Sequence, residues 1–276
     1  MTEYLANSAN LEKLRQAPWL VKASVLLHVA LLICLVIAPG LWPWLLAVFL
    51  ANHLLISLVG LWPRSTWLGS NWTELPQAAK RRNEVALTID DGPDPAVTRP
   101  VLDILDHYQV KATFFYIGYK AAKHSELCRE IVARGHAIEN HSQHHSVYFS
   151  MFGYTRMANE ILAAQETLQQ ITGIRPRFFR APAGLRNPFL DPVLKRLGLQ
   201  LASWSVRAFD TRTNDADKVK IRLINGLRPG AIILLHDGNA ARTVRNEPII
   251  VATLPALLEA AKAKGLHLVT LAQAAH

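Results

Sequence analysis

The sequence predicts an α/β domain, a seven-stranded (β/α) barrel, preceded by two apolar helices. Short β-rich runs alternate with longer amphipathic runs after residue 83, and this alternation favours a mostly parallel sheet. Polar residues of catalytic type stand where several of the β-rich runs end. Before residue 64, a long stretch of the chain carries no charge.

Residues 20–63 are predicted to form two membrane-spanning helices. No Asp, Glu, Lys or Arg occurs from Ala23 to Pro63, and one spanning helix needs about 20 apolar residues. The segment holds two such lengths, Leu20–Ala38 and Trp44–Trp62, on either side of the helix-breaking sequence PGLWPW. A single anchor with its second segment buried is the alternative. A cleaved signal peptide fits less well, because the apolar run is too long.

Basic residues flank both ends of this hairpin and are absent from its turn. Lys and Arg favour the cytoplasmic side of a membrane. We therefore expect residues 1–19 to form a cytoplasmic tail and the main domain to face the cytosol, at the inner membrane of a bacterium. Residues 64–83 are a polar, basic connector, and residues 84–276 form the main domain.

The main domain contains seven candidate strands. They cover residues 84–89, 111–118, 136–141, 176–182, 200–206, 231–237 and 266–271. Helical patterns lie between them, as at residues 155–173 and 248–265, and glycines stand where such helices should end. Seven strands suit either an open doubly wound sheet or a closed barrel.

Polar residues at the carboxyl ends of the candidate strands favour the barrel. In (β/α) barrels this face carries the chemistry. Six residues at the ends of five candidate strands point to one pocket there: Asp90, Asp91, His141, Arg180, Asp210 and His236.

A pair of histidines suggests a metal site. His141 and His145 are four residues apart, as ligands on one helical turn are, and His144 is a further candidate. Two surface histidines at this spacing are common, so the pair alone is a weak signal. Together with a carboxylate it forms a three-ligand set with an open position, which is typical of catalytic zinc.

Adjacent aspartates at a strand end can do different work. One of Asp90 and Asp91 can bind the metal while the other accepts a proton from water as general base. A cation and an arginine would relieve their mutual repulsion. An ordinary acidic turn through Gly92-Pro93 is the alternative; it does not explain the other strand-end residues.

The formal net charge is +9, and most of it lies after residue 63. Such a domain favours anionic partners such as acidic lipid or a phosphorylated substrate, although plain solubility charge is an equal alternative. No nucleic-acid-binding motif occurs, so no nucleic-acid partner is expected. Two distant cysteines predict neither a disulfide nor a cysteine-based metal site.

Five motifs resemble, in order and spacing, those of the polysaccharide deacetylases, the NodB-homology group of carbohydrate esterase family 4. They are TIDDGPD (88–94), HSQHH (141–145), RAPAG (180–184), WSVRAFD (204–210) and LLHDG (234–238). The resemblance implies a distorted (β/α) barrel that hydrolyses the N-acetyl amide of an amino sugar. It also implies a divalent metal, usually zinc, bound by Asp91, His141 and His145.

The resemblance assigns further roles. Asp90 would be the general base, oriented by Arg180, and His236 the general acid, held by Asp210. The backbone N–H of Ala183 would stabilise the oxyanion. Leu234 and Trp204 would line the pocket for the acyl methyl group.

Departures from the family pattern suggest an unusual substrate. The family usually has an aromatic residue in place of Ala183, an acid in place of Arg207 and an aromatic in place of Thr211. Arg207 suits an anionic group, and Arg242 and Arg245 in the loop 240–248 could grip a phosphate, unless that loop is merely solvated.

With the hairpin, these departures indicate an N-acylated amino sugar on a polyprenyl phosphate or a lipid A-type precursor. The resemblance is then to the membrane-bound deacetylases and deformylases of lipid-linked amino sugars. A periplasmic or extracellular deacetylase of peptidoglycan or exopolysaccharide is the main alternative. A non-catalytic carbohydrate-binding protein is disfavoured, because both proton-transfer residues and all three ligands are present.

Overall fold

The computed structural model describes residues 17–276, so most of the predicted cytoplasmic tail lies outside the described residues. Within them, eight short parallel strands form one sheet in the order β5-β4-β3-β2-β1-β7-β6, and β8 pairs with the first half of β1. The strands are β1 Glu84–Asp90, β2 Thr113–Tyr116, β3 Ala137–Asn140, β4 Phe178–Phe179, β5 Gln200–Leu201, β6 Val206–Arg207, β7 Ile232–His236 and β8 His267–Val269.

The structure corrects the single strand predicted at residues 200–206. That segment forms β5 and β6, the two edge strands of the sheet, joined by residues 202–205. The residues between β5 and β6 form hydrogen bonds to other segments of the chain: the Ser203 N–H donates to the Trp72 carbonyl (2.8 Å) and the Ser205 N–H to the Ile232 carbonyl (3.0 Å). The sheet is therefore a curled half-barrel whose edges are joined by the chain itself. This confirms the predicted distorted barrel, with eight strands in place of seven.

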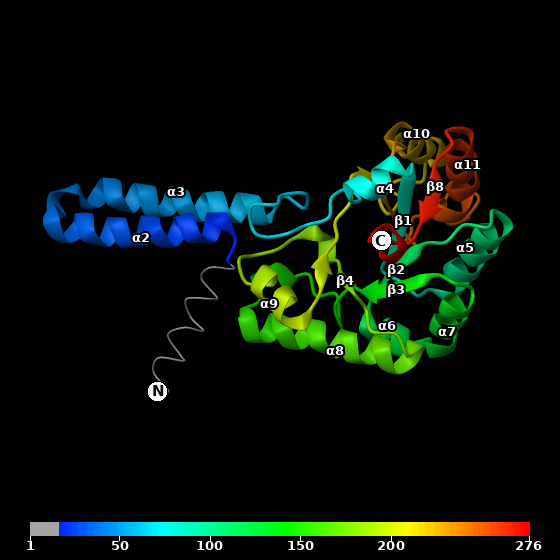
Figure 1. The fold of residues 1–276 in the computed structure, drawn as a ribbon, viewed down its shortest axis with the longest axis horizontal. Coiled ribbons are helices and arrows are strands. Elements are labelled where there is room, and N and C mark those ends of the chain that lie inside the picture. Colours follow the sequence, from blue (N-terminus) through cyan, green and yellow to red (C-terminus); the bar gives the residue numbers. More distant parts are fainter. Residues whose placement is uncertain (1–16) are drawn as a thin grey trace.

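The longer helices pack around the outside of the sheet (Figure 1). The α-helices that follow the hairpin are α4 Gln77–Arg81 in the connector and, in the main domain, α5 Pro95–His107, α6 Gly118–Lys123, α7 Ser125–Ala133, α8 Tyr154–Thr172, α9 Leu190–Leu197, α10 Ala216–Gly226, α11 Ile249–Ala263 and α12 Leu271–Ala274. Short 3₁₀ turns are η2 Phe149–Met151 and η3 Pro182–Gly184. The helical patterns at residues 155–173 and 248–265 correspond to α8 and α11. Gly173 ends α8 with a φ of 73°, a backbone conformation that glycine adopts without strain.

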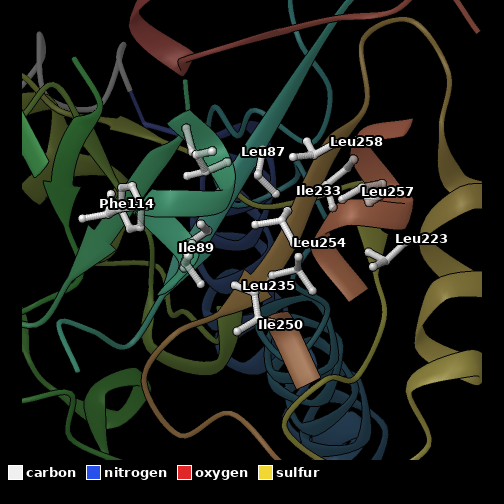
Figure 2. Close-up of a cluster of buried hydrophobic side chains, with 14 of the residues drawn as sticks. Leu87, Ile89, Phe114, Leu223, Ile233, Leu235, Ile250, Leu254, Leu257 and Leu258 are labelled. Atoms are coloured by element: carbon white, nitrogen blue, oxygen red, sulfur yellow. The ribbon is translucent and has the colours of Figure 1, made fainter. Parts of the chain in front are cut away.

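Alternation along the central strands separates the core from the site. Leu87 and Ile89 of β1 and Ile233 and Leu235 of β7 belong to the apolar core shared with α10 and α11 (Figure 2). Because successive side chains of a strand point to opposite faces, the intervening residues point into the curl of the sheet. The last of these inward residues is Asp90 on β1 and His236 on β7, which are paired across the two strands.

Two long helices project from the domain as an antiparallel hairpin (Figure 1). They are α2 Trp19–Ile37 and α3 Trp42–Gly60, joined by the turn η1 Pro39–Leu41. By length and composition both could cross a membrane, and most of their side chains are exposed. Asn52 of α3 donates a hydrogen bond to Ser24 of α2 (2.8 Å). That the hairpin spans a membrane, and in which direction, stays a prediction.

The base of the hairpin is fixed to the main domain. Leu20, Val59 and Leu68 form a small buried cluster. The Arg186 N–H donates to the Gly60 carbonyl (3.1 Å), and the Arg186 guanidinium donates to the Ser65 carbonyl. These contacts tie the end of α3 to the loop that follows β4. The connector then runs along the sheet, where Trp72 and Glu74 form single bridges to Ala202 and Ala231.

Candidate active site

A cavity of about 190 Å³ opens at the carboxyl ends of the strands. Four of the six residues predicted to meet there line it directly, and Arg180 and Asp210 lie behind its wall, where both are fully buried. The lining residues are Asp90, Asp91, His141, His145, Ala181, Ala183, Gly184, Trp204, Arg207, Thr211, Arg212, Leu234, His236 and Asn239.

The two neighbouring aspartates diverge because the backbone turns between them. Asp90 is the last residue of β1, and Asp91 has a φ of 73°, a conformation that Asp tolerates better than most residues. The Asp90 carboxylate consequently faces Arg180, and the Asp91 carboxylate faces two histidines. Gly92 follows because no side chain fits there: a Cβ atom would collide with Asp237.

Asp91, His141 and His145 form a compact ligand set. Asp91 Oδ1 lies 3.3 Å from His141 Nε2 and 3.2 Å from His145 Nε2, and the three ligand atoms lie within 4.8 Å of one another. His141 Nδ1 is 2.8 Å from the Arg180 carbonyl. A proton on Nδ1 makes that hydrogen bond and leaves the Nε2 lone pair for a metal.

This set fits a divalent cation. Asp91 Oδ1 is buried and has no hydrogen-bond partner. A bound cation would compensate for this missing partner. Burial alone would raise the pKa of Asp91, but His141, His236 and His145 lower that pKa well below its usual range. The carboxylate is thus ionised, as a metal ligand must be.

The histidine pair does not lie on a helical turn, so that part of the prediction is wrong. Residues 141–147 form a loop, in which Ser142 and His145 have positive φ values of 65° and 51°. The His145 N–H donates to Ser142 Oγ (3.0 Å), and this contact folds the loop back so that both imidazoles converge. His144 lies outside the set: its side chain is 67% exposed and pairs with Glu160 (3.0 Å).

Arg180 holds Asp90 from behind. Its Nη1 donates to Asp90 Oδ1 (2.6 Å) and to Thr88 Oγ1 (2.8 Å). Its remaining N–H groups donate to the carbonyls of Ala202 (3.0 Å) and Ser203 (2.8 Å). Burial lowers the pKa of Arg180 and Asp90 opposes this effect, and the guanidinium stays charged. The other carboxylate oxygen, Oδ2, lies 3.9 Å from His141 Nε2, on the side of the ligand set.

His236 and Asp210 form a second buried pair. Asp210 Oδ1 accepts from His236 Nδ1 (3.0 Å), and Asp210 Oδ2 accepts from the His236 backbone N–H (2.7 Å). Burial alone would lower the pKa of His236. The charge and hydrogen bond of Asp210, with Asp90 and Asp91 nearby, outweigh burial and raise that pKa to about 9. At neutral pH the imidazole is therefore protonated and can give up a proton.

The predicted wall residues divide into two groups. Ala183, with a φ of 54°, lines the cavity together with Leu234, Trp204 and Arg207. Arg245 does not: it lies on the exposed loop 239–248 and is not part of the lining. Arg242 on the same loop donates to the Asn246 carbonyl (2.7 Å).

Sequence reasoning missed three residues of the site. Asn239 donates to Asp91 Oδ2 (3.3 Å), and Arg212 lines the cavity. Asp237 is fully buried and accepts from Thr98 (2.5 Å) and Tyr116 (2.8 Å), and burial raises its pKa to about 7. All three stand within three residues of His236 or Asp210, which is the signal that could have found them.

Comparisons with known proteins bear on the family. The family model described as polysaccharide deacetylase matches residues 77–202. The chitooligosaccharide deacetylase of Bradyrhizobium sp. is 36% identical over 173 residues, which are 59% of this chain and 78% of that protein. The chain belongs to the polysaccharide deacetylase (NodB, CE4) family.

Solved structures of this family share the fold. The Bc1960 peptidoglycan N-acetylglucosamine deacetylase is 30% identical with a TM-score of 0.65, and the match covers 74% of this chain and 91% of that one. A CE4 family pseudoenzyme from Bacillus anthracis is 21% identical with a TM-score of 0.64, over 70% of this chain and 66% of that one. Because a pseudoenzyme has this fold as well, an inference of activity must rest on the side chains of the cavity.

Proposed function

We propose that this protein is a metal-dependent N-deacetylase of an amino sugar carried on a membrane lipid. Family membership supports a carbohydrate deacetylase. The observation that carries the proposal is one cavity with a three-residue ligand set, a carboxylate anchored by a buried arginine, and a protonated imidazole.

Asp91, His141 and His145 would hold the metal, and zinc is the ion that such a set with an open position favours. The metal would supply the Lewis acidity that amide hydrolysis needs at neutral pH. His141 is pre-oriented for this task by its hydrogen bond to the Arg180 carbonyl. Asn239 steadies the Asp91 oxygen that does not face the histidines.

Asp90 would accept the proton of the attacking water. Arg180 occupies Asp90 Oδ1, which leaves Oδ2 beside the ligand set as the basic atom. A carboxylate in this role must be held at hydrogen-bonding distance from the water. The four hydrogen bonds of Arg180 provide that rigidity.

His236 would donate its proton to the leaving nitrogen as the C–N bond breaks, giving the free amine and acetate (or formate). Asp210 keeps His236 protonated until that step. The backbone N–H of Ala183 would stabilise the charge on the carbonyl oxygen. Leu234 and Trp204 would bound a pocket for the small acyl group.

The place of the hairpin supports a lipid-linked substrate. Pro63, shortly after α3, and Trp204 of the cavity wall both pack closely on Gly184, where an added Cβ atom would collide with each of them. If α3 spans a bilayer, the mouth of the cavity then opens near its surface. Arg207 and Arg212 on the lining suit an anionic group. From the basic flanks of the hairpin, the domain would face the cytosol of a bacterium.

A polymer deacetylase outside the cytosol is the second candidate. The names of the relatives support it, since they are a chitooligosaccharide deacetylase and a peptidoglycan N-acetylglucosamine deacetylase. A reporter fused after His276 separates the two. Green fluorescence would support the cytosolic side, and alkaline phosphatase activity would support the opposite side.

Acyl release from a substrate panel tests the proposal itself. The panel holds undecaprenyl-phosphate-linked N-acetylhexosamine, a soluble chitin oligomer and peptidoglycan, each with and without chelator. Release from the lipid-linked sugar alone, lost with chelator and restored by zinc, is expected. Release from the polymers alone would keep the chemistry and overturn the substrate.

A further inference from the structure

A second cavity, of about 330 Å³, lies between the end of the hairpin and the catalytic cavity. Two of its lining residues, Trp204 and Arg207, also line the catalytic cavity. Its full lining is Trp62, Pro63, Arg64, Trp204, Ser205, Arg207 and Phe209. The chain directly after α3 therefore builds one wall, and the segment that includes β6 builds the other.

The chemistry of this second cavity is cationic and aromatic. Arg64 and Arg207 line it, and its lining includes no carboxylate. The Arg207 guanidinium lies 5.3 Å from the Trp204 ring and 5.1 Å from the Phe209 ring. Arg207 Nε is buried without a hydrogen-bond partner. An unpaired buried donor is costly, and an anionic oxygen is the acceptor that would satisfy it best.

The hairpin side of this second cavity is held in place. The Pro63 carbonyl accepts from Ser203 Oγ (2.7 Å) and from Asn71 Nδ2 (2.9 Å). α3 ends at Gly60, and Arg64 follows the end of this apolar helix by about as many residues as one helical turn contains. Lipid phosphates lie at this level of a bilayer, where basic and aromatic side chains gather. Trp62, which is 54% exposed, stands between Arg64 and the apolar helix.

We propose that the second cavity binds the phosphate that joins the amino sugar to its lipid carrier. The end of the hairpin is then part of the substrate site, with Arg64 and Arg207 as phosphate ligands and Trp62 beside the first apolar part of the chain. The acyl group lies on the other side of Trp204, in the catalytic cavity. This inference rests on the proposed function and names the part of the substrate that the protein recognises.

Binding to the full-length protein in detergent micelles tests the inference without turnover. Farnesyl phosphate is titrated by calorimetry beside inorganic phosphate, which lacks the chain, and farnesol, which lacks the charge. Farnesyl phosphate should bind more tightly than either. Arg64→Gln should weaken it about tenfold, the lower range for one charge-assisted hydrogen bond. Arg81→Gln, a matched change at an exposed arginine that lines neither cavity, should not.

Farnesyl phosphate and farnesol binding equally well would overturn the inference, and so would an equal loss in Arg64→Gln and Arg81→Gln. Inorganic phosphate binding as tightly as farnesyl phosphate would keep the phosphate site and overturn the role of the lipid. These outcomes do not depend on whether the protein is active.

Turnover separates the inference from the proposed function. N-acetylglucosamine is joined to farnesol through a phosphate, and N-acetylglucosamine 1-phosphate and chitotriose are compared with it. The ratio of kcat/KM on the farnesyl substrate to kcat/KM on chitotriose should fall about tenfold in Arg64→Gln. An unchanged ratio in an active enzyme would overturn the inference alone. Farnesyl phosphate binding with no acyl release from any substrate would overturn the proposed function and leave the phosphate site standing.

Discussion

The floor of the catalytic cavity (Asp90, Arg180, Asp210, His236 and the ligand set) and its wall on the hairpin side differ in how their charged groups are paired. On the floor, Asp90 is paired with Arg180 and Asp210 with His236, and all four residues are buried. On the wall, Arg207 rests against aromatic rings and keeps a buried N–H without a partner. The floor therefore already holds the charge pairs that the proposed proton transfers need, whereas the wall keeps a donor that the proposed phosphate would satisfy.

The largest effect should come from the ligand set on the floor. His145→Asn should remove a metal ligand, abolish stoichiometric zinc and lower kcat/KM at least about 1000-fold, because a metal contributes several kcal/mol to the transition state. Metal content is measured by plasma mass spectrometry beside activity. His144→Asn is the matched control, since that side chain is exposed and paired with Glu160. Equal losses of zinc in the two variants would contradict the assignment.

Arg180→Met tests the buried pair of the floor. The variant leaves the Asp90 carboxylate buried without its partner, so kcat should fall at least about 100-fold and the free energy of unfolding by about 3–5 kcal/mol. Urea denaturation in micelles measures the second quantity.

Adding Asp90→Asn to Arg180→Met should restore part of the lost stability while the protein stays inactive, because the unpaired charge is gone. Single and double variants of equal stability would refute the charge pairing.

Asp210→Asn should move the alkaline limb of the pH–rate profile. His236 must be protonated to act as an acid, so activity is present below its pKa of about 9 and falls as the pH rises through that value. Removal of the Asp210 charge leaves only Asp90 and Asp91 to oppose the effect of burial and so lowers the pKa of His236, and the limb should shift to lower pH. At neutral pH kcat/KM should fall roughly 100-fold. A pH–kcat/KM profile whose alkaline limb does not move would rule out this role of Asp210.

The smallest effect on catalysis is expected from a substitution in the wall. Arg207→Gln should raise KM for a phosphate-linked substrate about tenfold with little change in kcat, since it removes one charged contact. Arg245→Gln, on the exposed loop outside the cavity, should change KM less than about twofold, as exposed charges usually do. Steady-state kinetics at low and high salt compares them. A larger effect for Arg245 would mean that its loop closes over the substrate.

The floor was open to prediction from sequence, and the wall only in part: Trp204 and Arg207 were expected at the cavity, but the contribution of residues 62–64 was not. Most floor residues lie at or shortly after the ends of strands, and the carboxyl ends of parallel strands meet on one face of the barrel. The structure brings these residues together, although the loop conformation that makes His141 and His145 converge left no helical signature. The burial of Asp237 could not be predicted from the sequence, because its hydrogen-bond partners Tyr116 and Thr98 lie far away along the chain. The second cavity joins residues 62–64 to residues 204–209, and no local pattern links them.

The proposed mechanism depends on Asp90 acting as general base while Asp91 binds the metal, and the variant Asp90→Asn separates these two roles. Asp90→Asn is purified beside the wild type, and zinc per chain and acyl release are measured on the same preparation. We predict that the variant keeps about one zinc per chain and loses acyl release about 1000-fold, within the range for a general base. Loss of zinc together with activity would assign Asp90 to the metal, and retained activity with full zinc would show that another group accepts the proton.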